Sequence, residues 1–592
     1  MVALQRTAFF DAIERHDANT PAIIHSLSGR SFNYGSILSD VAAVKENLLQ
    51  VTGKTEQSLV GERIAFLVEN AYEYVVTLLA CFASNAIAVP LAPSFPPSEL
   101  RYIINHSEAC VLLSSRKFSG LAASVLKEGL DHRPVSAHLQ KIEHGSTSAI
   151  PVNMTGYTHE AEGGMMLYTS GTTARPKGVL LPTHVLTAQC RSLLEAWKYT
   201  AKDRLLHVLP LHHIHGTVNA LLTPLLAGGS IEFMFPFNVD NVWKRFAAPF
   251  MPQNEHANGF TSEQQKVPIT FFTVVPTIWA RMLQSHPHLP EPLQTATREA
   301  IKRRHLRLNI SGSAALPTPT KKAWSSLSSG NILLERYGMT EVGMALSCGL
   351  ADEDRIDGSV GWPLPSVEAR LVDSDTNEVI PIGQDQTADG KERSGEIQLR
   401  GPTIFRGYWR NPEATKKEFT SDGWFKTGDI AVRRLVSGSG EGKSGNWARG
   451  PAYFILGRKS ADIIKTGGEK VSALEVEREL LSLPEVRECA VVALPSVAWG
   501  QKVAAVVVLS DVGNLAGKGG KKWSALDMRR ALQGRLAAYK IPQDMVVVDA
   551  IPRNAMGKIN KRELVDTVFG NQEKIRRRSI VVAEERQKRK NG

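Results

Sequence analysis

The segment from Tyr168 to Gly178, Tyr-Thr-Ser-Gly-Thr-Thr-Ala-Arg-Pro-Lys-Gly, most constrains what this chain can fold into. Its glycines let backbone N–H groups approach an anion closely, its hydroxyls donate hydrogen bonds, and its lysine supplies a compact positive charge. The order of residues is not that of a Walker A loop, because Gly-x4-Gly-Lys-Ser/Thr is missing. We predict a phosphate-binding loop for a nucleoside triphosphate, formed by Thr169, Ser170, Gly171, Thr172, Thr173 and Lys177.

This loop is expected at the end of a buried strand. The apolar run Met165–Tyr168 precedes it, and Pro176 with Gly178 opposes continuation as a helix. In open α/β sheets, ligands bind at strand ends. The alternative is a mobile Ser/Thr/Gly linker, against which the flanking apolar residues argue.

Composition describes an ordinary globular protein of several domains. The chain has 592 residues, of which 43% are hydrophobic and 22% charged, so it can bury a large core. Its five cysteines have neither CxxC nor metal-ligand spacing, which indicates a reducing compartment without a disulfide framework or zinc site. The formal charge of +11 arises partly from short basic runs without aromatics, so we expect solubilising tails rather than nucleic-acid binding.

No apolar run has the length of a membrane span. The first residues carry Asp11 and Glu14 and are interpreted as an amphipathic helix rather than a transit peptide, and a secretory apolar region is missing. The chain ends in Lys-Asn-Gly, unlike the Ser-Lys-Leu type of peroxisomal address. We expect a cytoplasmic location, with a mitochondrial one as the alternative, and oligomeric state leaves no mark in the sequence.

Strand-like and helical patterns alternate along the first three quarters of the chain, which predicts wound α/β layers. From about Val367 to Tyr408 the pattern indicates a β-rich subdomain, and residues 383–394 and 437–450 are expected to be surface loops. Within the second loop, Gly438–Ser444 imitates a P-loop with one residue too few, and we interpret it as a flexible insertion.

After Gly457-Arg458 the pattern restarts as a small α+β unit, with helices expected at Ala473–Leu481 and Ala525–Leu536. The predicted fold class is therefore α/β. It consists of a large N-terminal domain, residues 1–457, which includes the β-rich subdomain, and a small mobile C-terminal domain, residues 458–592. A basic tail is expected after about residue 570.

The phosphate loop resembles the signature of the adenylate-forming enzymes, the superfamily of acyl-CoA synthetases, luciferases and the adenylation domains of peptide synthetases. Further segments resemble that family's motifs in the same order along nearly the whole chain. They are Leu209–Gly216 (LPLHHIHG), Ser311–Pro317 (SGSAALP), Tyr337–Glu341 (YGMTE), Trp424–Asp429 (WFKTGD), Gly457-Arg458, Lys465–Lys470 (KTGGEK) and Pro552–Lys558 (PRNAMGK).

The resemblance implies ATP and Mg²⁺ as ligands and CoA as co-substrate. Glu341 is expected to hold Mg²⁺, with Thr172 as a second ligand, while Thr340 contacts the α-phosphate and Tyr337, followed by Gly338, stacks on adenine. The alternative for Glu341 is a helix-capping role.

The remaining nucleotide contacts also follow from the resemblance. Asp429 is expected to accept hydrogen bonds from the ribose hydroxyls with help from Arg458, with a surface ion pair as the alternative. Lys558 resembles the lysine that stabilises charge during adenylation, so Lys558, Glu341 and Thr340 are the expected catalytic residues.

The resemblance also implies movement of the small domain. Lys558 and the CoA-binding segment Gly467, Gly468 and Lys470 cannot both face one active site, so the domain is expected to rotate about a hinge near Arg458–Ser460. Ser460 departs from the Asp or Lys of many relatives, which leaves the hinge residue open. Ala174 departs from the usual glycine of the phosphate loop, a mild change outside left-handed backbone.

The acyl substrate is inferred from Arg336. A positive charge beside an acyl pocket is costly unless an anion meets it, and a dicarboxylate offers a second carboxylate for that purpose. His213, His215 and Ser311 are expected to line the pocket, with Arg281 as a second cationic partner. A metal site among the histidines from His207 to His215 is the alternative for that cluster.

With these segments the chain resembles the malonyl-CoA synthetases in particular. That resemblance implies the conversion of malonate, ATP and CoA to malonyl-CoA, AMP and pyrophosphate through an acyl-adenylate, with methylmalonate as a further substrate. If Arg336 instead pairs with Glu335 or another protein carboxylate, a medium-chain or aromatic acyl-CoA synthetase is the alternative. An adenylation enzyme that loads a carrier protein, or a non-catalytic protein, is a third class.

Overall fold

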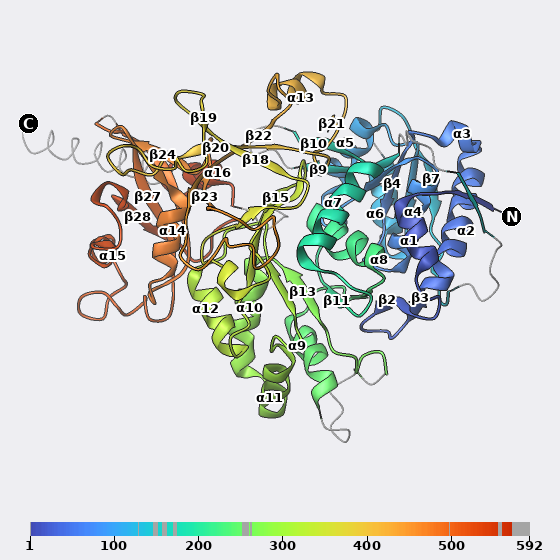
Figure 1. Ribbon diagram of the computed structural model, residues 1–592, viewed down its shortest axis with the longest axis horizontal. Coiled ribbons are helices and arrows are strands. Elements are labelled where there is room, and N and C mark those ends of the chain that lie inside the picture. The colour runs from blue at the N-terminus through green and yellow to red at the C-terminus, as the bar shows by residue number, and fades with distance from the viewer. Residues whose placement is uncertain are drawn as a thin grey trace, which may run out of the picture.

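The computed structural model describes residues 2–127, 129–145, 152–156, 163–169, 175–251, 260, 263–496, 498–553 and 559–570. Its largest sheet has nine strands in the order β17-β16-β15-β14-β13-β11-β12-β2-β3 (Figure 1). The strands from β15 to β2 are parallel, and both edges are antiparallel. Their bounds are β2 Pro21–His25, β3 Ser31–Asn33, β11 Arg204–His207, β12 Ser230–Phe233, β13 Phe271–Val274, β14 Leu308–Ser311, β15 Leu334–Met339, β16 Gly343–Ser347 and β17 Trp362–Pro363.

A second sheet has seven strands in the order β21-β10-β9-β5-β4-β6-β7. Strands β9, β5, β4, β6 and β7 are parallel, and β10 and β21 extend the sheet antiparallel. Their bounds are β4 Arg63–Leu67, β5 Ile87–Pro90, β6 Val111–Ser114, β7 Val135–His138, β9 Gly164–Thr169, β10 Lys177–Pro182 and β21 Gly407–Tyr408. The strand expected before the phosphate loop is β9, and its hairpin with β10 brackets that loop.

Helices lie between the two sheets and on their outer faces (Figure 1). One hydrophobic core contains side chains of both sheets, such as Phe66 and Ile310, together with α4, whose residues are all buried. A helix that is apolar all round belongs in such a position. The longer helices are α1 Ala8–Arg15, α2 Tyr34–Thr52, α4 Tyr72–Ala83, α5 Pro97–Ser107, α6 Ser119–Leu126, α7 Thr183–Trp197, α9 Val239–Ala247, α10 Pro276–Ser285, α11 Glu291–Ala300, α12 Thr318–Leu327 and α13 Pro412–Glu418.

Shorter helical turns are α3 Glu56–Leu59, α8 Thr223–Ala227, the π-helix η2 His215–Leu222, and the 3-10 turns η1 Arg116–Phe118, η3 Ala248–Phe250, η4 His286–His288 and η5 Asp352–Asp354. A second core lies on the other face of the nine-stranded sheet, where α9, α10 and α12 contribute Trp243, Trp279 and Trp324. Trp279 is fully buried in this core.

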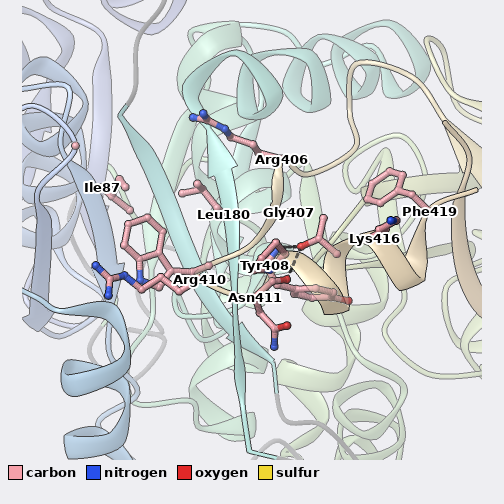
Figure 2. A pocket seen from close by; sticks show the side chains of 13 residues that line it. Ile87, Leu180, Arg406, Gly407, Tyr408, Arg410, Asn411, Lys416 and Phe419 are labelled. Carbon is pink, nitrogen blue, oxygen red and sulfur yellow. Dashed lines mark hydrogen bonds between the residues drawn. The ribbon is translucent and has the colours of Figure 1, made fainter. Parts of the chain in front are cut away.

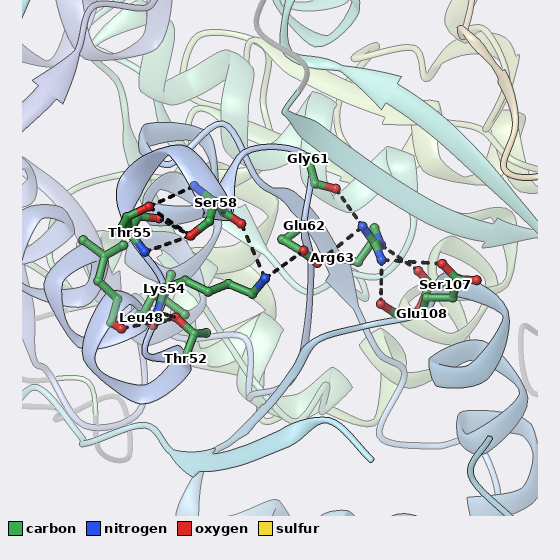
Figure 3. Close-up of polar contacts among 11 residues, drawn as sticks. Leu48, Thr52, Lys54, Thr55, Ser58, Gly61, Glu62, Arg63, Ser107 and Glu108 are labelled. Atoms are coloured by element: carbon green, nitrogen blue, oxygen red, sulfur yellow. Dashed lines mark hydrogen bonds and ion pairs between the residues drawn. The ribbon is translucent and has the colours of Figure 1, made fainter. Parts of the chain in front are cut away.

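Polar contacts fix the amino end of β4 (Figure 3). Arg63 donates hydrogen bonds to the carbonyls of Ser107 and Glu108, each at 2.9 Å, and to that of Gly61 at 3.0 Å. The last carbonyls of α5 have no partner within the helix, and a cation is favourable at the negative end of a helix dipole. Arg63 therefore ties α5 to the seven-stranded sheet.

The β-rich subdomain is a five-stranded antiparallel sheet in the order β19-β18-β20-β22-β23. Its bounds are β18 Glu368–Asp373, β19 Val379–Ile380, β20 Gly395–Arg400, β22 Phe425–Arg434 and β23 Ala452–Arg458. The sheet reaches Arg458, beyond the expected limit at Tyr408, whereas β21 with Tyr408 joins the seven-stranded sheet instead. That correction follows from long-range pairing, which local patterns do not reveal.

The loop at residues 437–450 is folded against the chain, so the interpretation of Gly438–Ser444 as a flexible insertion is wrong. Ser444 is buried, and its Oγ donates to Asp354 Oδ2 at 2.5 Å, while the N–H of Gly440 donates to Asp354 Oδ1 at 3.0 Å. Asp354 is fully buried and needs these donors. The glycines and serine therefore satisfy a buried carboxylate.

The N-terminal expectation also needs correction. Residues Val2–Gln5 form β1, which pairs in parallel with β8 Val152–Thr155, and only then does α1 begin. Thr7 caps this helix by accepting from the N–H of Phe10. No helix in the described part of the chain is both long and apolar enough to cross a lipid bilayer.

The C-terminal part is a separate sheet, β25-β24-β27-β26, with β28 paired to β27. Its bounds are β24 Ile463–Thr466, β25 Glu469–Ser472, α14 Ala473–Leu481, β26 Val486–Ser496, β27 Gly500–Leu509, α15 Ala525–Leu532, η6 Ala538–Lys540, β28 Asp544–Val547, α16 Lys561–Leu564 and η7 Val565–Phe569. Helix α14 has the predicted bounds. Helix α15 ends at Leu532 instead of Leu536, because Gln533 is extended and Gly534 has a φ of 78°.

Candidate active site

The β9–β10 hairpin positions the phosphate loop. Thr169, the last residue of β9, pairs with Lys177, the first residue of β10. Ser170, Gly171, Thr172 and Thr173 lie between them and are outside the described residues. The ammonium of Lys177 lies 4.3 Å from the centroid of the Tyr408 ring. The tyrosine hydroxyl donates to Glu341 Oε1 at 2.9 Å. Lys177 and Glu341, predicted as phosphate and metal partners, are therefore brought to the same tyrosine.

Glu341 is a buried carboxylate that follows the half-buried Thr340 at the end of β15. Burial raises the pKa of Glu341 above its ordinary value, while the hydrogen bond from Tyr408 and the charges of Arg458 and Lys177 lower it. A divalent cation would offset the cost of keeping this carboxylate charged, and carboxylate oxygen is a hard ligand that Mg²⁺ prefers. The residues present therefore fit Mg²⁺. Glu341 caps no helix, because it lies in the turn between the antiparallel strands β15 and β16.

Asp429 stands at the centre of a second group. The hydroxyl of Tyr337 donates to its Oδ2 at 2.6 Å, and Nε of Arg458 donates to its Oδ1 at 3.1 Å. Asp429 pairs with Arg458 across the β22–β23 ladder and is buried, so a merely superficial ion pair does not describe it. Gly338 follows Tyr337, and its missing side chain lets β16 approach, because a Cβ there would lie 2.0 Å from the Gly343 carbonyl oxygen.

Arg336 is the charged residue at the acyl side. Its side chain is buried at 4% exposure, and burial lowers its pKa to about 9. Nη2 donates to Ser313 Oγ at 3.3 Å, while Nε is buried without a hydrogen-bond partner in the described structure. No carboxylate among the described residues lies within ion-pair distance of it. Glu335 instead accepts from Lys321 Nζ at 2.8 Å, so the expected internal alternative, a pair of Arg336 with Glu335, is wrong.

Gly312 and Ser313 shape the backbone under this guanidinium. A Cβ at Gly312 would lie 2.3 Å from Arg336 Nε, so only glycine leaves room for the side chain. Ser313 has a φ of 69°, a left-handed conformation that costs energy for any residue with a side chain. Such strain is typical of functional sites, and Ser313 is exposed although Arg336 beside it is buried.

Ser313, and not Ser311, is the serine that contacts Arg336. Ser311 pairs with Glu335 in the β14–β15 ladder, and paired residues of a parallel sheet point to the same face. Arg336, one residue further, points to the opposite face. Ser311 is thus not brought to the guanidinium, and the prediction that it lines this site is corrected. The alternation of side chains along a strand could have distinguished Ser311 from Ser313, but the sequence does not show where β14 ends.

The other predicted acyl residues are placed differently from one another. His215 is buried, with Nδ1 3.3 Å from Ser313 Oγ. Burial lowers its pKa well below the ordinary value, and the charge of Arg336 lowers it further. His213 is half-buried, its ring 4.3 Å from that of His212. Arg281 is exposed on α10 with its guanidinium 5.2 Å from the Phe237 ring centroid, and the structure gives it no contact with Arg336.

The expectation of a metal at the histidines finds no support in the described structure, which contains no group of three or more His, Cys, Asp or Glu side chains arranged around a common point. His207 instead lies 2.9 Å from the carbonyl oxygen of Gly216 through Nε2. Because Gly216 belongs to the π-helix η2, that contact links the end of β11 to the first turn of η2, which contains His215.

The predicted CoA-binding residues form the turn between β24 and β25. Gly467 and Gly468 have φ values of 57° and 87°, and a Cβ at Gly467 would lie 2.7 Å from the ring of Trp499. Lys470 pairs with Asp375 of the β18–β19 turn at 2.6 Å. The turn thus contacts the β-rich subdomain. Lys558 is outside the described residues.

A cavity of about 680 Å³ lies beside β21 (Figure 2). It contains none of the sequence-predicted site residues, although Tyr408, which contacts Glu341, is part of its wall. Aromatic and cationic side chains dominate the remainder, namely Trp409, Phe419, Arg406, Arg410 and Lys416. Tyr408 was missed by the sequence analysis because only the tertiary pairing of β21 with β10 brings it to the site.

Family models match most of the chain. The model described as AMP-binding enzyme matches residues 9–409, and the AMP-binding enzyme C-terminal domain matches residues 475–558. A CoA ligase of Gibberella moniliformis is 62% identical over 98% of this chain and 97% of its own. Human mitochondrial malonate–CoA ligase ACSF3 is 38% identical over 90% and 87%.

The solved structure of ATP-bound MatB from Rhodopseudomonas palustris is also similar, with a TM-score of 0.74 and 31% identity over 95% of this chain and 98% of that one. This chain belongs to the AMP-binding enzyme family, whose members form acyl-adenylates. Within that family it is an AMP-forming acyl-CoA synthetase, which uses ATP, Mg²⁺ and CoA together with a small carboxylate.

Proposed function

We propose that this enzyme is a malonate–CoA ligase, which converts malonate, ATP and CoA to malonyl-CoA, AMP and pyrophosphate. The observation that carries the proposal is the buried Arg336, which has no carboxylate partner in the described structure. A buried charge without a counter-ion is costly, and a substrate that brings its own second carboxylate removes this cost. Malonate–CoA ligases at 36–38% identity support the same substrate.

The reaction has two balanced steps. First, a carboxylate oxygen of malonate forms a bond to the α-phosphorus of ATP, and pyrophosphate leaves. Second, the sulfur of CoA bonds to the acyl carbon, AMP leaves, and the thiol proton passes to solvent. Mg²⁺, held by Glu341, supplies charge stabilisation for the phosphates when bound.

The residues of the chain bind and orient the reactants. Lys177 lies where its charge balances phosphate, and Asp429 offers its two oxygens to ribose hydroxyls beside Tyr337. Arg336 and Ser313 hold the distal carboxylate, so that the other carboxylate points towards the nucleotide. We further propose that Lys558 stabilises charge in the adenylation step, and that Ser170, Gly171, Thr172 and Thr173 bind phosphate.

We also propose a division at Gly457, with residues 1–457 as the large domain and 458–592 as the small one. Strand β23 ends at Arg458 and β24 begins at Ile463, so the hinge falls in the turn between them. Rotation about this turn would exchange Lys558 for Gly467, Gly468 and Lys470, the proposed CoA contacts. Breaking the 2.6 Å contact of Lys470 with Asp375 is part of that exchange.

Methylmalonate is proposed as a second substrate. One extra methyl group changes binding by only about 1–3 kcal/mol in a pocket. A solved malonyl-CoA ligase product complex contains methylmalonyl-CoA and AMP, and it is 29% identical to this chain with a TM-score of 0.57. Location is a separate prediction: a cytoplasmic site is favoured, whereas the human relative is mitochondrial by name. Fractionation of tagged protein separates the two.

The test is pyrophosphate release with ATP, Mg²⁺ and CoA, in which malonate, methylmalonate, acetate, octanoate and benzoate are compared. Wild type is expected to prefer malonate, and Arg336→Ala to lose about 100-fold in malonate kcat/KM, as when one partner of a buried charge pair is removed. Arg281→Ala is the matched control, since it removes an exposed arginine. If wild type prefers octanoate or benzoate and Arg336→Ala is fully active, the enzyme is a medium-chain or aromatic acyl-CoA synthetase and not a malonate–CoA ligase.

A further inference from the structure

Three buried polar residues continue the acyl site into the core behind His215. His215 Nε2 lies 2.7 Å from Thr273 Oγ1, and Asn219 Nδ2 donates to the same hydroxyl oxygen at 3.2 Å. Tyr199 OH donates to Asn219 at Oδ1, 2.6 Å, and at the backbone carbonyl, 2.8 Å. Thr273 belongs to β13, Asn219 to the π-helix η2, and Tyr199 follows α7. Parts of the chain far apart in sequence thus converge on one imidazole.

The direction of these hydrogen bonds follows from the orientation of the Asn219 amide. Its Oδ1 faces the Tyr199 hydroxyl and its Nδ2 faces Thr273, so the amide nitrogen is the atom that donates to Thr273. The threonine hydroxyl therefore keeps one proton to donate. In the described structure its other polar neighbour is His215 Nε2. Donation from Thr273 Oγ1 to Nε2 is the arrangement in which each of these buried groups has a partner.

This series of hydrogen bonds determines which ring nitrogen of His215 carries the proton. Its pKa is held well below the ordinary value by burial and by Arg336, so the ring is neutral and carries one N–H. If Nε2 accepts from Thr273, that N–H is on Nδ1, which faces Ser313 Oγ at 3.3 Å. Ser313 Oγ also accepts from Arg336 Nη2. With two donors directed at its oxygen, the serine hydroxyl must direct its own proton elsewhere.

Resting on the malonate–CoA ligase activity proposed above, we propose that Tyr199, Asn219 and Thr273 are positioning residues that hold His215 with its proton on Nδ1. Ser313 then presents its hydroxyl proton beside Arg336, towards the distal carboxylate of the substrate. A carboxylate only accepts hydrogen bonds, so two donors suit it. A monocarboxylate such as acetate leaves both donors without a partner. The enzyme thereby discriminates between dicarboxylates and monocarboxylates.

The π-helix contributes to this arrangement. His215 and Asn219 stand at positions i and i+4 of η2, and both reach Thr273 on the neighbouring strand. π-Helical turns are rare and occur mostly at functional sites. The wider turn brings both side chains to a single hydroxyl, which links the backbone irregularity to the specificity of the site.

The kinetic test compares Thr273→Val with Thr223→Val. Valine keeps the shape of threonine and removes the hydroxyl, which releases the constraint on His215. We expect the KM for malonate to rise about tenfold with a smaller change in kcat, and the preference for malonate over acetate to fall. Thr223 is equally buried, and its hydroxyl donates to the carbonyl of Val218 and has no hydrogen bond with His215 in the described structure, so its variant is expected to resemble wild type. An equal loss on both substrates would overturn the positioning role.

A second measurement reports on the tautomer without any substrate. The ¹⁵N NMR spectrum of the histidine-labelled enzyme is expected to show His215, identified by its disappearance in His215→Gln, with the proton on Nδ1 in wild type and in Thr223→Val. A proton on Nε2 would overturn the proposal. If malonate is not converted although Nδ1 carries the proton, the substrate assignment fails and the tautomer-fixing chain stands.

Ser313→Gly completes the design. At a φ of 69° glycine is unstrained, so this change removes the hydroxyl from a backbone conformation that glycine adopts readily. Its KM for malonate is expected to rise about as much as that of Thr273→Val, because both changes remove the same donor. Combining the two is expected to add little to either alone. A fully additive double variant would contradict a shared pathway.

Discussion

Two of the buried arginines of this enzyme, Arg245 and Arg336, have opposite surroundings. Arg245 on α9 is fully buried and donates to both oxygens of Glu232, at 2.6 and 2.8 Å. Arg336 on β15 is almost as buried, but the described structure gives it only the hydroxyl of Ser313. Arginine thus forms a structural cross-link at position 245, whereas at position 336 its charge is available to a ligand. Burial alone does not identify a binding residue, and what separates Arg336 from Arg245 is that the described structure gives its buried charge a hydroxyl and no counter-ion.

The largest expected effect is on stability. Arg245→Met leaves Glu232 buried and uncompensated, which is expected to lower the free energy of unfolding by about 3–5 kcal/mol. Arg336→Met removes a buried charge that has no partner, so its free energy of unfolding is expected to be unchanged or higher. Chemical denaturation of both variants measures the difference. Equal destabilisation by the two changes would show that Arg336 also has a protein counter-ion.

A smaller effect is expected from Gly312→Ala. The new Cβ would overlap the guanidinium of Arg336, and accommodating such a clash costs about 1–3 kcal/mol. Because the clash moves Arg336 away from the substrate, malonate kcat/KM is expected to fall while acetate kcat/KM changes little. Gly120→Ala, at a glycine of α6 that has open space around it and no positive φ, controls for the added methyl group. An equal loss of kcat/KM on malonate and acetate would show that Gly312→Ala does not act by displacing Arg336.

The smallest expected effect is on pH dependence. Burial lowers the pKa of Arg336 to about 9, so the free enzyme loses this positive charge as pH rises through about 9. Below that pH the arginine is protonated in both the folded and the unfolded chain. Above it only the unfolded chain keeps the proton, and the penalty for burying the charge disappears.

The KM for malonate is therefore expected to rise above about pH 9, while the KM for acetate is expected to rise less. Measuring both substrates on one enzyme controls for the titration of other groups. If the KM values for malonate and acetate change with pH in the same way, the rise in KM is not caused by deprotonation of Arg336.

The sequence predicted much of the scaffold because its signals are local. The strand Val111–Ser114 and the helix Ala473–Leu481 have the expected bounds, since a short apolar run or a period of 3.6 residues marks each. The pairing of Tyr408 with β10 was not predictable, because nothing local specifies a two-residue strand. The folded Gly438–Ser444 loop was missed for the same reason, since its partner Asp354 is distant in sequence.

The site shows the same division. Lys177, Glu341, Asp429 and Arg336 could be named from motifs, because their residue types carry the chemistry. Which serine meets Arg336 could not, because that depends on where β14 ends and on the left-handed backbone at Ser313. The pairing of Glu335 with Lys321 was equally hidden, since α12 is brought to β15 only by the fold. Motifs thus identify the reacting groups, and packing decides their partners.

The most direct test of Arg336 as the counter-ion of the substrate is malonate binding without turnover. Calorimetric titration of malonate into the enzyme saturated with Mg²⁺ and a non-hydrolysable ATP analogue separates binding from the chemical steps. Wild type and Arg281→Ala are expected to bind malonate alike, and Arg336→Met is expected to bind it about 100-fold more weakly. Equal affinity of wild type and Arg336→Met would contradict the account.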